Sequence, residues 1–171
     1  MIVFSEARSQ PDSYIDNQIV RLTEEAKQAN IKVCYIPEDF DDVSAGDALA
    51  WCPYFDTETL GFVAGYIPTE RRYIQLYHAA LEHNVRLINS PEQSNTIMDF
   101  EKFYPLIQDL TPKSIVVNNT KDLKNLDIGF PLFIKGAIKS EKEKGWDACV
   151  AVNKTDLKKK CEVMFRRNYS A

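Results

Sequence analysis

Two lysines stand four residues apart in an apolar run within the last quarter of the chain. The run FPLFIKGAIKSEKEKGWDACVAVN covers residues 130–153, and an extended backbone there would place Lys135 and Lys139 on one face beside Phe133. A lysine in the middle of an apolar strand is unfavourable unless its ammonium group meets an anion. The spacing therefore indicates two cations that could lie along a polyphosphate, with residues 141–145 as a loop closing over it. The alternative is a surface strand with solvated lysines.

Basic residues are concentrated in the same part of the sequence. Residues 1–134 hold 11 Lys and Arg against 20 Asp and Glu, whereas residues 135–171 hold 10 against 5. The net charge of the 171-residue chain is −4, so only its last segment would attract a polyanion. We interpret the basic helix expected over residues 157–167 as a solvated face, and we expect no nucleic-acid partner.

The elements that would position the lysines indicate an α/β protein. A strand over residues 1–4, a helix over residues 14–29 and a strand over residues 31–36 form the opening of a parallel sheet. Residues 48–55 are apolar and fit either a strand or a buried connection. Further strands are expected over 60–66, 85–88 and 114–118, and further helices over 69–84, 93–100, 103–109 and 120–125.

The two-lysine segment itself predicts a hairpin. Residues 132–138 and 148–152 would be its strands, and the charged stretch between them its loop. Pro112 breaks the chain upstream, so we expect a change of structural unit around residues 111–113.

The same segment resembles the first half of an ATP-grasp domain. The pattern F-P-apolar-F-I-K is followed by a second lysine, a loop, and the short strand with Ala-Cys. Upstream, GYIPTERRYIQLYHAALEHNVRLINSPEQ (residues 65–93) resembles the pre-ATP-grasp region of the clade named for one arginine and two lysines. The likeness covers about residues 65–152. It implies a Rossmann-like pre-ATP-grasp domain with a parallel sheet over residues 1–111, and a partial α+β ATP-grasp lobe over residues 112–171.

The resemblance implies roles for particular residues of the hairpin segment. Lys135 would be the strand lysine that contacts the phosphates of ATP. Lys139 and Ser140 would stand at the entrance of the phosphate loop. Lys144 and Gly145 would lie on that loop, as would Lys142, although a solvated loop fits these three equally well.

Two upstream features of the resemblance are less specific. The corner N-S-P-E-Q at residues 89–93 would face the ligand cleft, although a helix cap led by Ser90 explains it equally well. The arginine of the clade has no assigned counterpart. Arg71 and Arg72 are expected to be solvated on their helix.

The function implied by the resemblance is that of an ATP-dependent carboxylate–amine ligase acting through an acyl phosphate. Magnesium ligands would come from the second half of such a domain, and no Asp or Glu after Lys135 has a ligand context. We therefore expect the Mg²⁺ ligands outside this chain, no metal site within it, no assigned catalytic residue, and little activity from the chain alone. The alternative is a non-catalytic, truncated or split module that binds a nucleotide or a protein, either a second copy or a complementing subunit.

The remaining titratable residues point to no further site. The four cysteines form no C-x-x-C pair, and we expect reduced thiols, with Cys34 and Cys149 buried in strands. His78 and His83 are five residues apart on one helix, on different faces, and are not expected to bind a metal. No apolar run approaches 18 residues and no secretory signal is evident, so we expect a cytoplasmic protein with no membrane partner.

Overall fold

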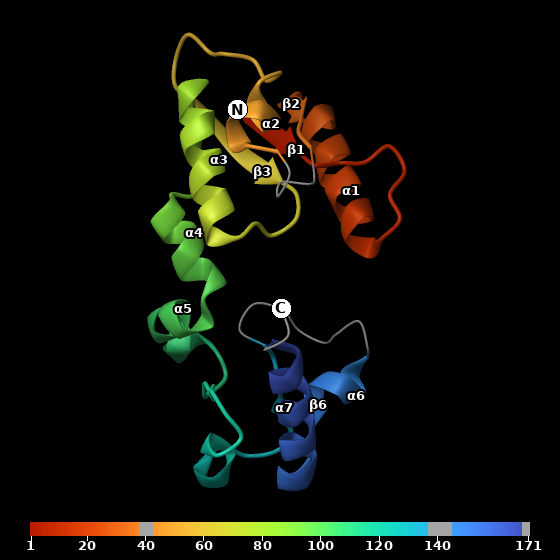
Figure 1. Ribbon diagram of the computed structural model, residues 1–171, viewed down its shortest axis with the longest axis vertical. Coiled ribbons are helices and arrows are strands. Elements are labelled where there is room, and N and C mark those ends of the chain that lie inside the picture. Colours follow the sequence, from red (N-terminus) through yellow and green to blue (C-terminus); the bar gives the residue numbers. More distant parts are fainter. Residues whose placement is uncertain (38–42, 137–144, 169–171) are drawn as a thin grey trace. The chain divides into compact units, whose positions relative to one another are not determined.

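A computed structural model describes residues 1–37, 43–136 and 145–168 (Figure 1). By its internal contacts the chain divides into two units, Met1–Asn95 and Thr96–Ala171. This division falls upstream of the change of unit expected near residue 111, and the assignment of domains stays a prediction. Each unit is described by itself below.

The first unit alternates strands and helices, as the sequence predicts. Residues 48–55, whose sequence fitted either a strand or a buried connection, begin within a short helix over residues 45–49. The elements are β1 (Ile2–Ser5), α1 (Tyr14–Gln28), β2 (Lys32–Tyr35), α2 (Ala45–Leu49), β3 (Thr59–Ala64), α3 (Glu70–Glu82) and β4 (Val85–Leu87). Helix α4 (Pro91–Met98) begins in this unit and ends in the next.

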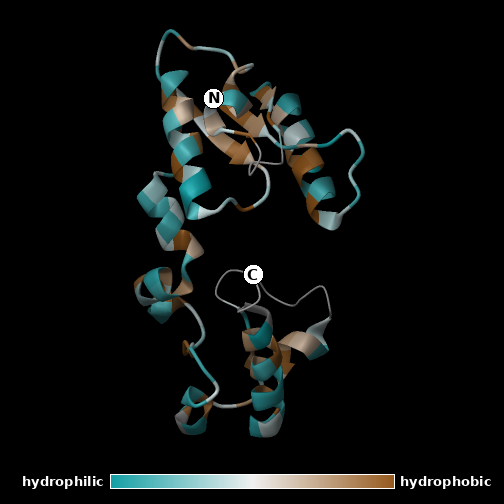
Figure 2. Cartoon of the chain, in the orientation of Figure 1, coloured by the Kyte–Doolittle hydropathy of each residue, from teal (hydrophilic) through white to brown (hydrophobic). Residues whose placement is uncertain are grey.

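The four strands form one parallel sheet in the order β2-β1-β3-β4. Central strand β1 is buried along its whole length. Its alternating side chains face two layers: Ile2 and Phe4 pack with α2 and α3, whereas Val3 packs with Ala26 of α1 on the opposite face. Figure 2 shows the apolar sheet strands and the polar residues on the helices around them. The expected α/β fold with a parallel sheet is thus confirmed.

Local sequence explains where α1 begins. The hydroxyl of Ser13 accepts a hydrogen bond from the backbone N–H of Asp16 at 3.0 Å, and Asp16 Oδ2 accepts one from the N–H of Ser13 at 3.0 Å. This reciprocal pair satisfies two N–H groups that have no partner within the helix.

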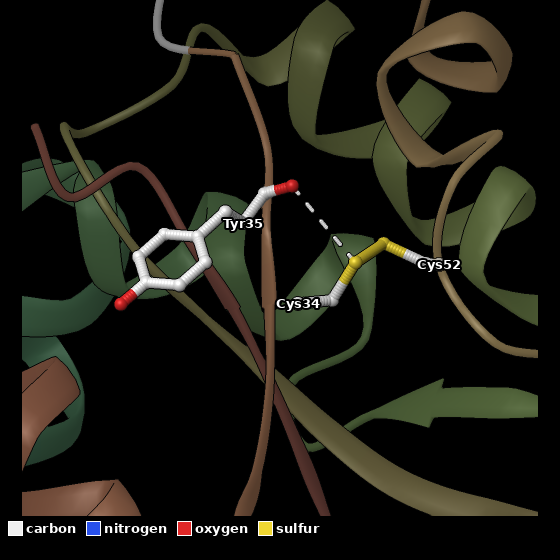
Figure 3. The surroundings of a disulfide bond; sticks show 3 residues. All are labelled: Cys34, Tyr35 and Cys52. Atoms are coloured by element: carbon white, nitrogen blue, oxygen red, sulfur yellow. Dashed lines mark hydrogen bonds between the residues drawn. A yellow bond between two sulfur atoms is a disulfide. The ribbon is translucent and has the colours of Figure 1, made fainter.

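The cysteines of the first unit are not reduced thiols. Cys34 of β2 and Cys52, which follows α2, form a disulfide with 5.7 Å between their Cα atoms (Figure 3). The expectation of reduced thiols is therefore wrong for this pair. It failed because the pairing depends on packing that brings two segments 18 residues apart together in the core. Cys149 and Cys161 of the second unit are free, as expected, and both are buried. Cys149 was expected in a strand, but it is the last residue of a short helix over residues 146–149.

The second unit contains short elements and one longer helix. One expected strand is absent: residues 114–118 adopt no regular backbone, and the N–H of Ser114 donates to the Tyr104 hydroxyl at 2.9 Å. The expected helix over 120–125 is a single 3-10 turn. The elements are α5 (Phe100–Ile107), η1 (Gln108–Leu110), η2 (Asp122–Asn125), β5 (Leu132–Phe133), α6 (Trp146–Cys149), β6 (Val150–Ala151) and α7 (Lys154–Asn168).

Candidate functional site

The predicted hairpin is present in the second unit, in a shorter form. Strands β5 and β6 are antiparallel, with Phe133 opposite Val150. The N–H of Ile134 also donates to the carbonyl of Cys149 at 2.6 Å, so the pairing extends one residue beyond β5. Of the strand expected over residues 132–138, only residues 132–133 are regular strand, 134–136 are not, and residues 137–138 lie outside the described residues. Residues 146–149, which include the expected start of the second strand, instead form α6.

The two faces of the hairpin differ in what they contact. Leu132, Ile134 and Ala151 pack into a core with Leu157 and Cys161 of α7. Lys160 of α7 fixes this layer, since its ammonium group donates to the carbonyl of Val150 and to Asp156, the latter at 2.9 Å.

The opposite face, called here the outer face, consists of Phe133, Lys135, Val150, Val152 and Trp146. Phe133 and Lys135 alternate with the packed residues of β5, and Val150 lies across from Phe133. Much of this face is open, because Trp146 is 76% exposed, Val152 63% and Phe133 48%. The outer face is an apolar surface with a lysine at one end.

Lys135 is exposed and directly follows Ile134, the last residue of this segment with a backbone hydrogen bond across the hairpin. Within the described parts of the chain it forms no ion pair. Ile134 packs into the core with α7 and Lys135 is exposed, although the regular strand ends before both of them, so the shared face of Lys135 and Lys139 stays a prediction. Its exposed ammonium group can bind an anion, and hydration by water would satisfy the same group equally well.

The other residues assigned to the phosphate loop are distributed differently. Lys139, Ser140, Lys142 and Lys144 lie outside the described residues. Gly145 is described and has φ of 85°, a left-handed conformation that side chains beyond glycine rarely adopt. Its observed role is to turn the backbone into α6.

That turn carries Trp146 onto Phe133. The two ring centroids are 6.0 Å apart at an interplanar angle of 71°, an edge-to-face arrangement. This aromatic pair is not among the site residues predicted from the sequence. The available signal was the position of Phe133, which shares the strand face of Lys135.

The corner at residues 89–93 forms a helix cap. The N–H of Ser90 donates to Gln93 Oε1 at 2.8 Å, and the N–H of Gln93 donates to Ser90 Oγ at 3.1 Å. The carbonyl of Asn89 accepts a hydrogen bond from the Tyr73 hydroxyl at 2.9 Å. The capping alternative is therefore confirmed, and contact of this corner with a ligand stays a prediction.

One of the two neighbouring arginines is buried, contrary to expectation. Arg71 is exposed, but Arg72 is 7% exposed and donates from Nη1 to the carbonyl of Val43 at 3.0 Å. Helical geometry turns successive residues by about 100°, so adjacent arginines need not share an environment. Arg72 holds the segment before α2 against α3.

The two histidines also differ in their surroundings. His78 is exposed, whereas His83 is buried and stacks on Tyr54 with ring centroids 4.1 Å apart. His83 follows the last residue of α3 and lies in the interior of the unit.

A polar cluster lies where β1 and β3 end, on neighbouring strands of the first unit. Asp16 accepts a hydrogen bond from the Tyr66 hydroxyl, and this bond together with that from Ser13 holds the pKa of Asp16 well below its usual value. The same bond raises the pKa of Tyr66. Glu6 is buried and accepts from the N–H of Tyr66 at 2.7 Å. These groups bind one another, so the cluster explains how two strand ends are joined.

Magnesium has no evident ligand set in the described parts of the chain. No group of three or more His, Cys, Asp or Glu side chains there is arranged to hold a metal ion. Asp156, the acidic residue at the start of α7, accepts from Lys160 and from the N–H of Val152, and the lysine bond lowers its pKa. The described residues do not fit a protein-held metal.

The fold and the hairpin define an α/β protein with a four-stranded parallel sheet and a separate small antiparallel hairpin. No helix among the described residues is long and apolar enough to cross a membrane. Comparison with protein-family models, with curated proteins and with solved structures finds no match for the chain. The ATP-grasp resemblance is therefore an interpretation of residues and motifs, and the function derived from it is a proposal.

Proposed function

We propose that this protein binds ATP at the outer face of the β5–β6 hairpin, as a pre-ATP-grasp domain followed by part of an ATP-grasp lobe. Lys135 contacts the phosphates. The loop residues Lys139, Ser140 and Lys144 complete the phosphate contacts, and Gly145 ends the loop. In an intact enzyme of this kind the reaction is the ligation of a carboxylate to an amine through an acyl phosphate.

The observation that carries this proposal is the position of Lys135. It is a cation without an ion-pair partner among the described residues, at the edge of an exposed apolar face whose reverse side is packed on α7. An ammonium group that forms no salt bridge with the described residues is a compact charge that can approach phosphate oxygens. The positive balance of residues 135–171 favours the same ligand.

The chemical role that follows for Lys135 is electrostatic. A lysine stabilises the charge on a transferring phosphoryl group by position and does not need to exchange a proton. Mg²⁺ is expected to arrive with the nucleotide or to be held by ligands outside this chain. The described residues supply binding, and the group that activates the carboxylate remains unassigned.

The test is the affinity of the full chain for ATP with Mg²⁺ after Lys135→Ala. Hydrogen bonds to charged groups contribute about 1.5–3 kcal/mol, so we expect the dissociation constant to rise at least tenfold. Thermal shift and titration calorimetry both report it, because ligand binding raises apparent stability by mass action. Lys135 is exposed, so the far-UV circular dichroism and the unfolding midpoint without ligand should not change.

The matched control is Lys154→Ala, which removes an exposed lysine from the start of α7 in the same unit. This variant should bind ATP like the wild type. Equal ATP affinity in the wild type and in Lys135→Ala would contradict the assignment of Lys135 to the phosphates.

The second candidate function is a non-catalytic module that binds a protein, either a second copy or a complementing subunit. The observation in its favour is the exposed apolar surface of the outer face, since contiguous apolar patches often mark contacts between proteins. Sedimentation at several protein concentrations distinguishes the two. A mass that rises with concentration in the absence of nucleotide favours the module, and a monomer that binds ATP favours the first proposal.

A further inference from the structure

The outer face combines two aromatic rings with one cation. Phe133 and Trp146 contact each other edge to face, and neither is enclosed by the described residues, with 48% and 76% of their surfaces exposed. Burying large aromatic side chains is favourable. A ligand that covers this exposed aromatic pair would therefore gain binding free energy from the apolar area it buries.

The arrangement of these rings relative to Lys135 restricts what can bind. Lys135 is two residues beyond Phe133, and both side chains are exposed, whereas Ile134 between them packs into the core with α7. A ligand that uses both features carries a planar ring at one end and an anionic group at the other. A phosphate chain alone would leave the rings uncovered, and an uncharged ring would leave the lysine unused.

We propose that the Phe133–Trp146 pair is the platform for the base of the nucleotide, with the indole of Trp146 stacked on the base. This rests on the proposed function, because it assigns the phosphates of the same ligand to Lys135. Gly145 contributes by geometry, since its left-handed backbone turns the chain so that Trp146 reaches Phe133. Stacking on an aromatic side chain is tolerant of base identity, so the platform accepts nucleotides with other bases as well as ATP.

The chain allows a direct optical test, because it contains two tryptophans. The other, Trp51, lies in the first unit and is 93% exposed. In Trp51→Phe, all tryptophan emission comes from Trp146. We expect ATP to change this emission with a saturable dependence on concentration. Tripolyphosphate, which has no base, should bind in calorimetry and change the emission far less.

Affinity measurements on variants separate the base from the phosphates. Trp146→Leu should weaken ATP binding at least fivefold, as expected from the loss of one stacked base, and leave the tripolyphosphate affinity unchanged. Phe133→Leu, which removes the ring that supports Trp146, should act in the same direction. The matched control Trp51→Leu, at an exposed tryptophan in the other unit, should change neither affinity. Both substituted rings are solvent-exposed, so unfolding midpoints should remain close to that of the wild type.

The outcomes distinguish failure of this inference from failure of the proposed function. If Lys135→Ala weakens ATP and tripolyphosphate binding while Trp146→Leu changes neither, the nucleotide site stands and the platform is overturned. If Trp146→Leu alters only the oligomeric state, the platform is likewise overturned and the face belongs to a second copy. If the wild type binds neither ATP nor tripolyphosphate, the proposed function fails, and the platform with it.

Discussion

At the scale of single residues, close packing at the end of β3 restricts one position to glycine. A Cβ atom on Gly65 would lie 2.3 Å from the carboxyl carbon of Glu6, which is itself buried. Glu6 cannot simply move away, because its carboxylate accepts the N–H of Tyr66 at 2.7 Å. The missing side chain at residue 65 is what allows a buried carboxylate to lie beneath the strand end.

We therefore expect Gly65→Ala to lower the free energy of unfolding by about 1–3 kcal/mol, the usual cost of overpacking. Urea denaturation followed by circular dichroism measures it. The control is Gly46→Ala in α2, where the nearest atom to the added Cβ is Ser44 Oγ at 3.9 Å. Alanine in a helix is favoured over glycine by about 0.5–1 kcal/mol, so this control should be stabilised. Equal effects of the two substitutions would refute the steric argument.

At the scale of secondary-structure elements, α1 is fixed by the carboxylate at its first turn. Asp16 caps its own helix through Ser13 and also bonds Tyr66, which follows β3. One carboxylate thus joins a helix start to a strand end. These bonds favour its charged form and keep its pKa well below the usual value.

Because the pKa of Asp16 is lowered in the folded protein, its charged carboxylate stabilises the fold. This contribution has its full size above the unfolded-state pKa, which is about 3.9 for aspartate. That stability is lost as the pH falls below this value toward the folded-state pKa. We expect Asp16→Asn to be less stable than the wild type at pH 7 and to lose less additional stability between pH 5 and pH 2. Thermal unfolding across this range measures both effects. Asp56→Asn, at an exposed loop position, is the control and should retain the wild-type acid dependence. A wild-type acid dependence in Asp16→Asn would show that this carboxylate is not responsible.

At the scale of the whole molecule, each unit has its own core and only the first contains a disulfide. The Cys34–Cys52 bond lies within the cluster that packs β1 against α2 and α3. Cys149 and Cys161, the free pair, belong to the second unit. Reduction should therefore act on the stability of the parallel-sheet unit.

Cross-linking a loop of about this length stabilises a protein by roughly 3 kcal/mol in the chain-entropy model. We expect dithiothreitol to lower the unfolding midpoint of the first unit by roughly 10–20 °C and to leave the midpoint of Cys34→Ala/Cys52→Ala unchanged. Thiol titration in denaturant counts the reactive cysteine thiols directly. Two of the four cysteines should react before reduction and four after it. Four reactive thiols without reductant would contradict the disulfide.

Most of the first unit could be predicted from short-range pattern. Ser13 and Asp16 mark the start of α1 by residue type and spacing, and the apolar runs at both ends of that helix predict neighbouring strands. Prediction was weaker in the second unit. Residues 114–118 have the composition of a strand, but Ser114 bonds a tyrosine hydroxyl and no neighbouring strand pairs with them in the described structure. A strand requires a partner, which composition does not supply.

The candidate site divides in the same way. The sequence by itself predicted a packed Ile134 between the exposed Phe133 and Lys135, because alternation along an extended chain is local geometry. Only the tertiary structure decided that Trp146 meets Phe133, that Arg72 is buried and that Cys34 pairs with Cys52. Each of these depends on segments distant in sequence being brought together by packing, and periodicity within one segment contains no information about which distant segment that will be.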